Sequence, residues 1–286
     1  MKRLLEVKEI LDLWDLILKD KNELYICTLT TKNISNNFSF LFRNRIIKYL
    51  APPKVKIINL DFDLRDCEEA VEETKYENSK HTIHSYMISE SIKLLEKNSF
   101  CLLIDIDAFP LNEFAIKTAF SLAKLKGING NIQRTNCIEN NKNIFIAESF
   151  MCFNVDLVKS LGDKAWKVNE RSDVSEEISW IYPDLIDQHL FKPIKTLFKP
   201  IWNLREEFPE YGIGTTFGYG NQKINYHHFY ARNFLSRLHF FFISLNYYLK
   251  IILRDKKKRN LDFRKFISSI KNEIKFSVKY VFGNLD

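Results

Sequence analysis

The chain has 286 residues, of which 45% are hydrophobic and 28% charged, and these values are typical of a globular protein with one sizeable core. Its net charge of +7 is uneven, because residues 232–286 hold 13 Lys and Arg against 4 Asp and Glu, or +9, which leaves −2 for the rest. Five single cysteines without a C-x-x-C pair exclude a disulfide framework or a zinc finger and favour buried thiols in a reducing cytosol. Charged residues interrupt the leucine-rich start of the chain, so we expect no signal peptide there.

The first hundred residues alternate between helical and strand patterns. We expect helices over 3–18, 38–49 and 67–96, the last broken near 78–81, and strands over 23–31 and 55–60. The first strand turns polar at Thr28 and Thr30, and the second ends at Asp61. In a doubly wound sheet, the end of the second strand is an expected position for a nucleotide, so Asp61 is a candidate, with a solvated turn as its alternative. Thr28 and Thr30 are nucleotide candidates only through the family resemblance given below, with simple hydroxyl capping of the strand end as their alternative.

The most informative stretch is the apolar run 100–104, which predicts a buried strand and is followed directly by Asp105 and Asp107. Residues two apart on a strand share a face, so both carboxylates should project at its carboxyl end, and Pro110 should stop the strand. Two carboxylates so close repel each other unless a cation lies beside them, and Mg²⁺ or Mn²⁺ suits such oxygen ligands. The alternative is a strand end that caps the next helix.

A helix is expected next, over 111–126, where Gly127 is a stop signal. Strands are expected over 128–134 and 143–154, and the second of these contains Glu148 within apolar residues. A carboxylate there is costly unless it is paired or faces a cavity, so Glu148 is a candidate base or acceptor contact. The alternation of strands and helices predicts an α/β, doubly wound sheet. Residues 164–226 contain scattered Pro and Gly and are expected to form a loop-rich half that covers a substrate.

Three motifs occur in order: Asp105-x-Asp107, then Asp187-Gln188, then His227-His228-Phe229. Together they resemble the nucleotide-sugar-dependent glycosyltransferases of the GT-A fold, in particular glycogenin-like and bacterial lipopolysaccharide galactosyltransferases. The resemblance spans about residues 22 to 232. It implies a GT-A, Rossmann-like doubly wound mixed sheet, a UDP-sugar or other nucleotide-sugar donor, and a Mn²⁺ or Mg²⁺ cofactor.

The resemblance also implies roles for the metal-site residues. Asp107 would be the more direct metal ligand, and Asp105 would be shared between the metal and the ribose. A late histidine would be the third ligand, and His228 is preferred over His227 because an aromatic residue follows it; a histidine packed in the core is the alternative. Arg232 could bind phosphate oxygens, with a surface charge as its alternative.

Further roles concern the sugar and the acceptor. Asp187 would bind sugar hydroxyls or take the acceptor's proton, and Gln188 would lie beside the donor sugar; a helix start at Asp187 is the alternative. An inverting enzyme needs a carboxylate base, for which Glu148 is the second candidate, whereas a retaining enzyme need not have one. The sequence leaves this choice open.

The C-terminal part is expected to form an extension, 232–286, appended to a catalytic domain of residues 1–231. An apolar helix over 234–253 leads into a basic cluster at 254–259, and a second amphipathic helix is expected over 263–282. This pattern favours an interfacial helix on an anionic membrane, with a helical hairpin packed on the body as the alternative.

The resulting hypothesis is a glycosyltransferase of cell-surface polysaccharide synthesis, such as lipopolysaccharide or capsule, peripheral on the cytoplasmic face of the membrane. Its partners would be a nucleotide-sugar, a glycan or lipid-linked acceptor and anionic lipid, without nucleic acid. A membrane- or nucleic-acid-surface binding protein is one rival. A D-x-D phosphatase is another, although such enzymes usually have Thr or Val where this chain has Phe109.

Overall fold

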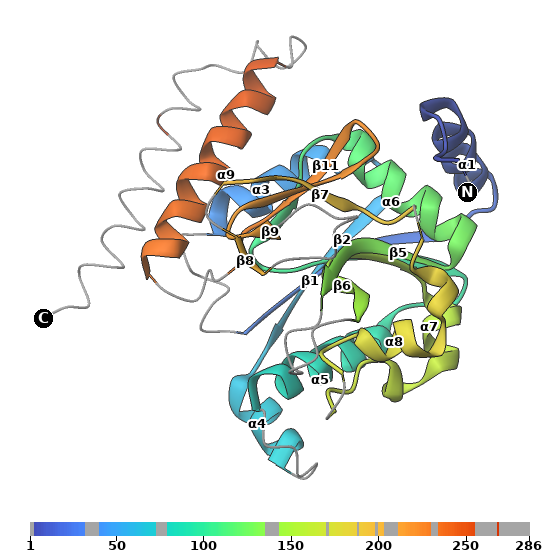
Figure 1. Ribbon diagram of the computed structural model, residues 1–286, viewed down its shortest axis with the longest axis vertical. Coiled ribbons are helices and arrows are strands. Elements are labelled where there is room, and N and C mark those ends of the chain that lie inside the picture. Colours follow the sequence, from blue (N-terminus) through green and yellow to red (C-terminus); the bar gives the residue numbers. More distant parts are fainter. Residues whose placement is uncertain are drawn as a thin grey trace, which may run out of the picture.

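The computed structural model describes residues 3–31, 40–72, 79–134, 143–169, 172–187, 189–197, 200–202, 211–229, 234–254 and 268. Its centre is a five-stranded sheet of order β2-β1-β3-β6-β5 (Figure 1). The strands are β1 (Glu23–Thr31), β2 (Val55–Phe62), β3 (Ser99–Ile104), β5 (Ile128–Arg134) and β6 (Ile144–Asn154). The first three strands are parallel, and β6 is antiparallel to both β3 and β5. The chain is therefore an α/β protein with a mixed sheet, as the sequence predicts.

Helices cover both faces of this sheet because its strands are apolar on both sides. Leu24 and Ile26 of β1 belong to one core, and Tyr25 and Cys27 belong to the other. The first core includes residues of α1 (Val7–Lys19), α3 (Leu41–Leu50), α6 (Glu113–Lys126) and α9 (Phe234–Arg254). The second includes residues of α4 (Leu64–Glu72), α5 (Ser79–Leu94), α7 (Val155–Leu161) and α8 (Glu176–Ile181). Figure 1 shows this three-layer arrangement.

The helix α6 illustrates how local sequence sets an element's bounds. The Asn112 side chain accepts a hydrogen bond from the Ala115 N–H at 2.7 Å and so caps the N-terminus. Gly127 ends the helix with a φ of 84°, in the region that favours glycine. The other helix and strand predictions up to residue 154 are confirmed to within a few residues, while the predicted break near 78–81 touches residues outside those described.

A second sheet, of order β4-β11-β10-β7, was not expected from the sequence. Its strands are β4 (Ala108–Pro110), β7 (Lys192–Thr196), β10 (Thr215–Tyr219) and β11 (Gln222–His227), and a small ribbon pairs β8 (Pro200–Trp202) with β9 (Tyr211–Gly212). The prediction that 164–226 is loop-rich is thus wrong for these strands. The chain turns at residues 106–107 after β3 has ended at Ile104, and the β4 strand that follows in the second sheet ends at Pro110, where the sequence predicts that strand structure stops.

The four described cysteines, residues 27, 67, 101 and 152, are buried and unbonded to one another. Among the described residues, no helix has both the length and the apolar character that a membrane crossing requires. The basic cluster and the predicted last helix lie almost entirely outside the described residues.

Candidate metal and nucleotide site

The two sheets meet at the loop that carries Asp105 and Asp107. The Asp105 N–H donates to the Ser149 carbonyl at 3.0 Å, and the Asp105 side chain accepts from the Ile106 N–H at 2.7 Å. The Ala108 N–H then returns to the Asp105 carbonyl at 3.1 Å, which closes a tight turn. The strand end is therefore fixed on both sides, and both carboxylates lie at the carboxyl end of β3, as predicted.

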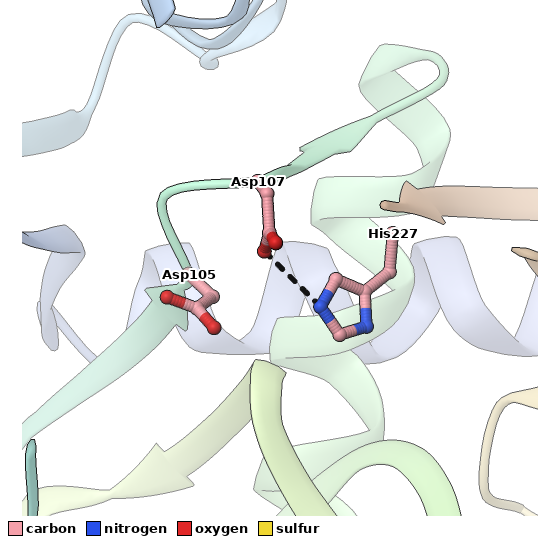
Figure 2. A group of neighbouring side chains, drawn as sticks. All are labelled: Asp105, Asp107 and His227. Carbon is pink, nitrogen blue, oxygen red and sulfur yellow. Dashed lines mark ion pairs between the residues drawn. The ribbon is translucent and has the colours of Figure 1, made fainter. Parts of the chain in front are cut away.

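His227 reaches this loop because β11 pairs with β4, so that His227 lies opposite Ala108. Its Nε2 is 3.1 Å from Asp107 Oδ1 (Figure 2). One ligand atom from each of Asp105, Asp107 and His227 lies within 4.8 Å of the others. Three side chains from two separate parts of the sequence thus converge on one point.

The cluster fits a divalent cation. Asp107 Oδ1 and His227 Nδ1 are buried and accept or donate no hydrogen bond within the described part of the chain, although Asp107 Oδ1 has the His227 ring beside it at 3.1 Å. Two carboxylates this close repel each other, and a cation bound between them relieves that repulsion. Two carboxylate oxygens suit Mg²⁺ or Mn²⁺, and the imidazole nitrogen favours the transition metal of the two.

The prediction that His228 is the third ligand is corrected by this geometry. Adjacent residues of a strand face opposite ways, and here His227 faces the carboxylates. The His228 ring is fully buried on the other side, where Nδ1 lies 2.7 Å from the Tyr226 hydroxyl and Nε2 lies 3.1 Å from Ser236 Oγ of α9. Burial, with help from the neighbouring histidines, lowers the pKa of His228 to about 3, so the ring stays neutral.

His228 nevertheless contributes through its backbone. Its N–H donates to the Asp107 carbonyl at 2.8 Å, so it holds the loop while its ring contacts α9. It is a positioning residue for the cluster, and it links the cluster directly to the C-terminal helix.

Arg43 of α3 is a further site residue, which the sequence reasoning missed. Its guanidinium is buried and donates to the carbonyls of Ile104 and Asp105, both at 2.8 Å, and of Ala108 at 3.1 Å. Burial lowers its pKa to about 10 although Asp105 and Asp107 oppose that shift, so the group stays charged at neutral pH. Arg43 therefore holds both ends of the loop and places a positive charge behind the two carboxylates. Its signal in the sequence is weak: an arginine within a helix that is otherwise apolar on one face.

The ends of β1 and β2 lie side by side, as expected. Thr28 Oγ1 donates to Asn59 Oδ1 at 2.6 Å, and the Thr30 hydroxyl donates to Asp61. Thr28 is buried whereas Asn59 and Asp61 are exposed. Asn59, which the sequence reasoning missed, lines a hollow of about 300 Å³ together with Arg43, Asn44, Ile47, Lys48 and Ile57. Polar groups and cations thus gather on the β1–β2 side of the carboxylates.

Glu148 lies near the cluster, because β6 runs on past the end of β3 and Ser149 bonds to Asp105. Its carboxylate is 3.7 Å from His84 Nδ1 and 3.4 Å from Ser175 Oγ. Burial, then the charges of Asp173 and Asp105, raises the pKa of Glu148 well above its usual value. Polar neighbours, and the 19% of the side chain that remains exposed, therefore reduce the free-energy cost of placing this carboxylate in an apolar strand.

Asp187 is not brought to the cluster. It forms an ion pair with Lys126 at 2.6 Å and accepts from the His189 N–H at 2.7 Å, beside the start of β5. That start pairs with Phe153, four residues or roughly 13 Å along β6 from Ser149. Asp187 does not open a helical stretch either, because a short 3₁₀ turn precedes it and β7 follows. Gln188 and Arg232 lie outside the described residues.

Two buried asparagine side chains link the strand that carries His227 to the central sheet. Asn225, two residues before His227, accepts from Asn131 at 3.0 Å and donates back to it at 2.7 Å. Asn131 also donates to Ser149 Oγ at 3.1 Å. This network fixes β11 against β5 and β6, and so fixes the register that carries His227.

No match to this chain exists among protein-family models, curated proteins or solved structures. Its function therefore has to be argued from the chemistry of the site.

Proposed function

We propose that the protein is a metal-dependent glycosyltransferase of the GT-A type that moves a sugar from a nucleotide-sugar to a glycan or lipid-linked acceptor. The observation that supports this most is the cluster of Asp105, Asp107 and His227 at the carboxyl end of a central strand, where one ligand atom of each lies within 4.8 Å of the others. Ligands of open α/β sheets bind at this edge. The cluster comes from the motif pattern that resembles the GT-A enzymes, with His227 in place of His228.

Asp105, Asp107 and His227 would hold Mn²⁺ or Mg²⁺. When bound, such a cation supplies Lewis acidity that neutralises the charge of a diphosphate leaving group. Arg43 keeps the loop in place and offsets the charge of the two carboxylates before a cation arrives. The fold would hold the three ligands at one point before the cation binds, which lowers the entropic cost of cation binding.

Thr28, Thr30, Asn59 and Asp61 are the candidates for holding the nucleoside. Hydroxyls, an amide and a carboxylate can hydrogen-bond a ribose and the edge of a base. The hollow beside Asn59 and Arg43 offers space and positive charge at the same edge. A UDP-sugar remains the first donor to test.

Glu148 is the candidate for the acceptor side. It lies near Asp105, keeps 19% of its side chain exposed, and is more basic when ionised than an ordinary glutamate. In an inverting reaction it would take the proton from the acceptor hydroxyl, and in a retaining reaction it would hydrogen-bond a sugar hydroxyl. Asp187, with its Lys126 partner, is no longer favoured for this role.

The test is thermal unfolding of wild type, Asp107→Asn and Asp15→Asn with nucleoside diphosphates and nucleotide-sugars, with and without Mn²⁺. Asp15 is an exposed carboxylate of α1 and serves as the matched control. A ligand at a hundred times its Kd adds about 2.7 kcal/mol to the free energy of unfolding, which corresponds to a rise in Tm of about 5 °C.

We expect one nucleotide to give a Mn²⁺-dependent shift of this size in wild type and in Asp15→Asn, and no shift in Asp107→Asn. Absence of a nucleotide shift in wild type, with or without metal, would overturn the proposal. A shift that persists in Asp107→Asn would mean that the nucleotide binds elsewhere.

A further inference from the structure

The helix α9 presents an apolar face to solvent. Leu235, Phe242 and Leu253 are 74%, 56% and 56% exposed. They are seven and eleven residues apart, so they lie on one side of the helix. We call Leu235, Phe242, Asn246, Lys250 and Leu253 the outer face. Isolated exposed apolar residues are ordinary, but three large ones along one side of a single helix form a surface.

The core does not need these side chains, because the opposite side of α9 packs on the body. Phe240, Phe241, Ser244 and Tyr248 are buried. The ring of Phe241 lies 5.2 Å from that of Phe42 in α3, and the ring of Phe240 lies 5.9 Å from that of Phe109 in β4. The helix is therefore held firmly by its inner side, and Figure 1 shows it alongside α3 at the edge of the molecule.

The charged residues of α9 itself are all basic. Residues 234–254 contain no Asp or Glu, and Lys250 and Arg254 are exposed near the C-terminal end of the helix. The sequence continues within two residues into Lys256-Lys257-Lys258-Arg259. Apolar side chains beside a cluster of cations complement an anionic membrane surface, where the apolar groups enter the acyl boundary and the cations meet headgroups. Nucleic acid would match the cations but would leave leucine side chains without a favourable contact.

We propose that the outer face of α9 docks on the surface of an anionic lipid bilayer. The helix lies along the surface, with Leu235, Phe242 and Leu253 toward the acyl chains and Lys250 and Arg254 at headgroup level. His228 connects α9 to the Asp107 loop, so the docked helix would hold the candidate metal site at a fixed orientation to the membrane. This inference rests on α9 and on the charge of the sequence that follows it, and it does not depend on the proposed function.

The test is flotation of the full chain with vesicles of phosphatidylcholine, with or without phosphatidylglycerol. The variants are Leu235→Asp and Phe242→Asp, and the control is Leu94→Asp. Leu94 in α5 is a leucine of nearly equal exposure, 70%, on a different face, so it introduces the same charge without touching α9. Circular dichroism and Tm establish that each variant is folded.

We expect wild type and Leu94→Asp to float with anionic vesicles, to lose about tenfold in partition on neutral vesicles, and to lose a similar factor between roughly 0.1 and 0.5 M salt. Leu235→Asp and Phe242→Asp should each lower the partition onto anionic vesicles about tenfold, because each replaces an apolar contact with the acyl chains by a charge. Asp107→Asn should float like wild type, which separates this inference from the proposed glycosyltransferase activity.

Three results would overturn the inference. The first is no flotation of wild type with anionic vesicles. The second is flotation of Leu235→Asp and Phe242→Asp equal to that of wild type. The third is a wild-type dimer in light scattering that Leu235→Asp dissociates, because the outer face would then bind a second copy of the chain.

Discussion

Replacing Arg43 by Met removes the guanidinium that holds the Asp105–Asp107 loop but keeps a side chain of similar length. The guanidinium is 1% exposed and donates to three carbonyls, at 2.8, 2.8 and 3.1 Å. Leaving a buried acceptor unpaired costs about 1–3 kcal/mol, so the three together cost about 6 kcal/mol. Met also avoids the cost of burying a charge. That burial lowers the pKa of Arg43 from 12.5 to about 10, a shift that corresponds to roughly 3 kcal/mol of lost stability in wild type. We therefore expect a net loss of about 3 kcal/mol in the free energy of unfolding.

Differential scanning fluorimetry and urea unfolding measure this loss. A loss of about 3 kcal/mol should lower Tm by about 6 °C. Arg43→Lys keeps the charge but has one nitrogen for three acceptors, so its loss should be smaller but clear. Lys48→Met, on an exposed position of the same helix, is the control and should melt like wild type.

The pH dependence provides a second check on Arg43. The pKa of Arg43 is lowered in the folded state, so burying the charged guanidinium reduces the free energy of unfolding by its full amount below pH 10. This reduction is relieved only as the pH rises above that value. The difference between wild type and Arg43→Met should therefore be constant from about pH 6 to 9. If Arg43→Met melts within about 1 °C of wild type, the guanidinium does not stabilise the loop in this way, because water or a rearranged loop then satisfies the carbonyls equally well.

Three further predictions follow from the same site. Glu148→Gln should raise Tm by about 2 °C at pH 7–8 and lose this advantage near pH 4–5. The pKa of Glu148 is raised in the folded state, so the ionised carboxylate destabilises the fold and the protonated one does not. A pH series of melting curves measures this, and equal curves at all pH values would contradict it. Gly130→Ala should cost about 1–3 kcal/mol, because the added Cβ would lie 2.7 Å from the Phe150 carbonyl; urea unfolding measures it, and an unchanged midpoint would mean that the β5–β6 bulge adjusts freely. His227→Ala should abolish a Mn²⁺-dependent rise in Tm, whereas His228→Ala should lower Tm by several degrees and keep that rise; the reverse pattern would restore His228 as the ligand.

The carboxylate pair and the elements around it could be predicted from the sequence because their signals are local. The run from Phe100 to Ile104 is apolar at every position, so it forms a buried strand whatever lies beside it. Asn112 and Gly127 specify the ends of α6 through bonds and angles within one turn of the chain. The parallel direction of β1, β2 and β3 follows from the helices that connect successive strands.

The second sheet could not be read in this way. Its strands are short, they include Pro193 and glycines that weaken a strand pattern, and their stability comes from pairing with segments far away in the sequence. The pairing of β11 with β4 in this sheet is what brings His227 to the Asp105–Asp107 loop.

Which side chains meet at the loop depends on how the two sheets pack together. The sequence puts two histidines in a row, and only the pairing of β11 with β4 turns His227 toward Asp107 and His228 toward α9. It likewise gives no sign that Arg43 binds carbonyls more than 60 residues away, or that Asp187 pairs with Lys126 instead of joining the cluster. Helix and strand patterns depend on neighbours in the chain, whereas a site depends on contacts between distant segments, and those are fixed only when the sheets pack together.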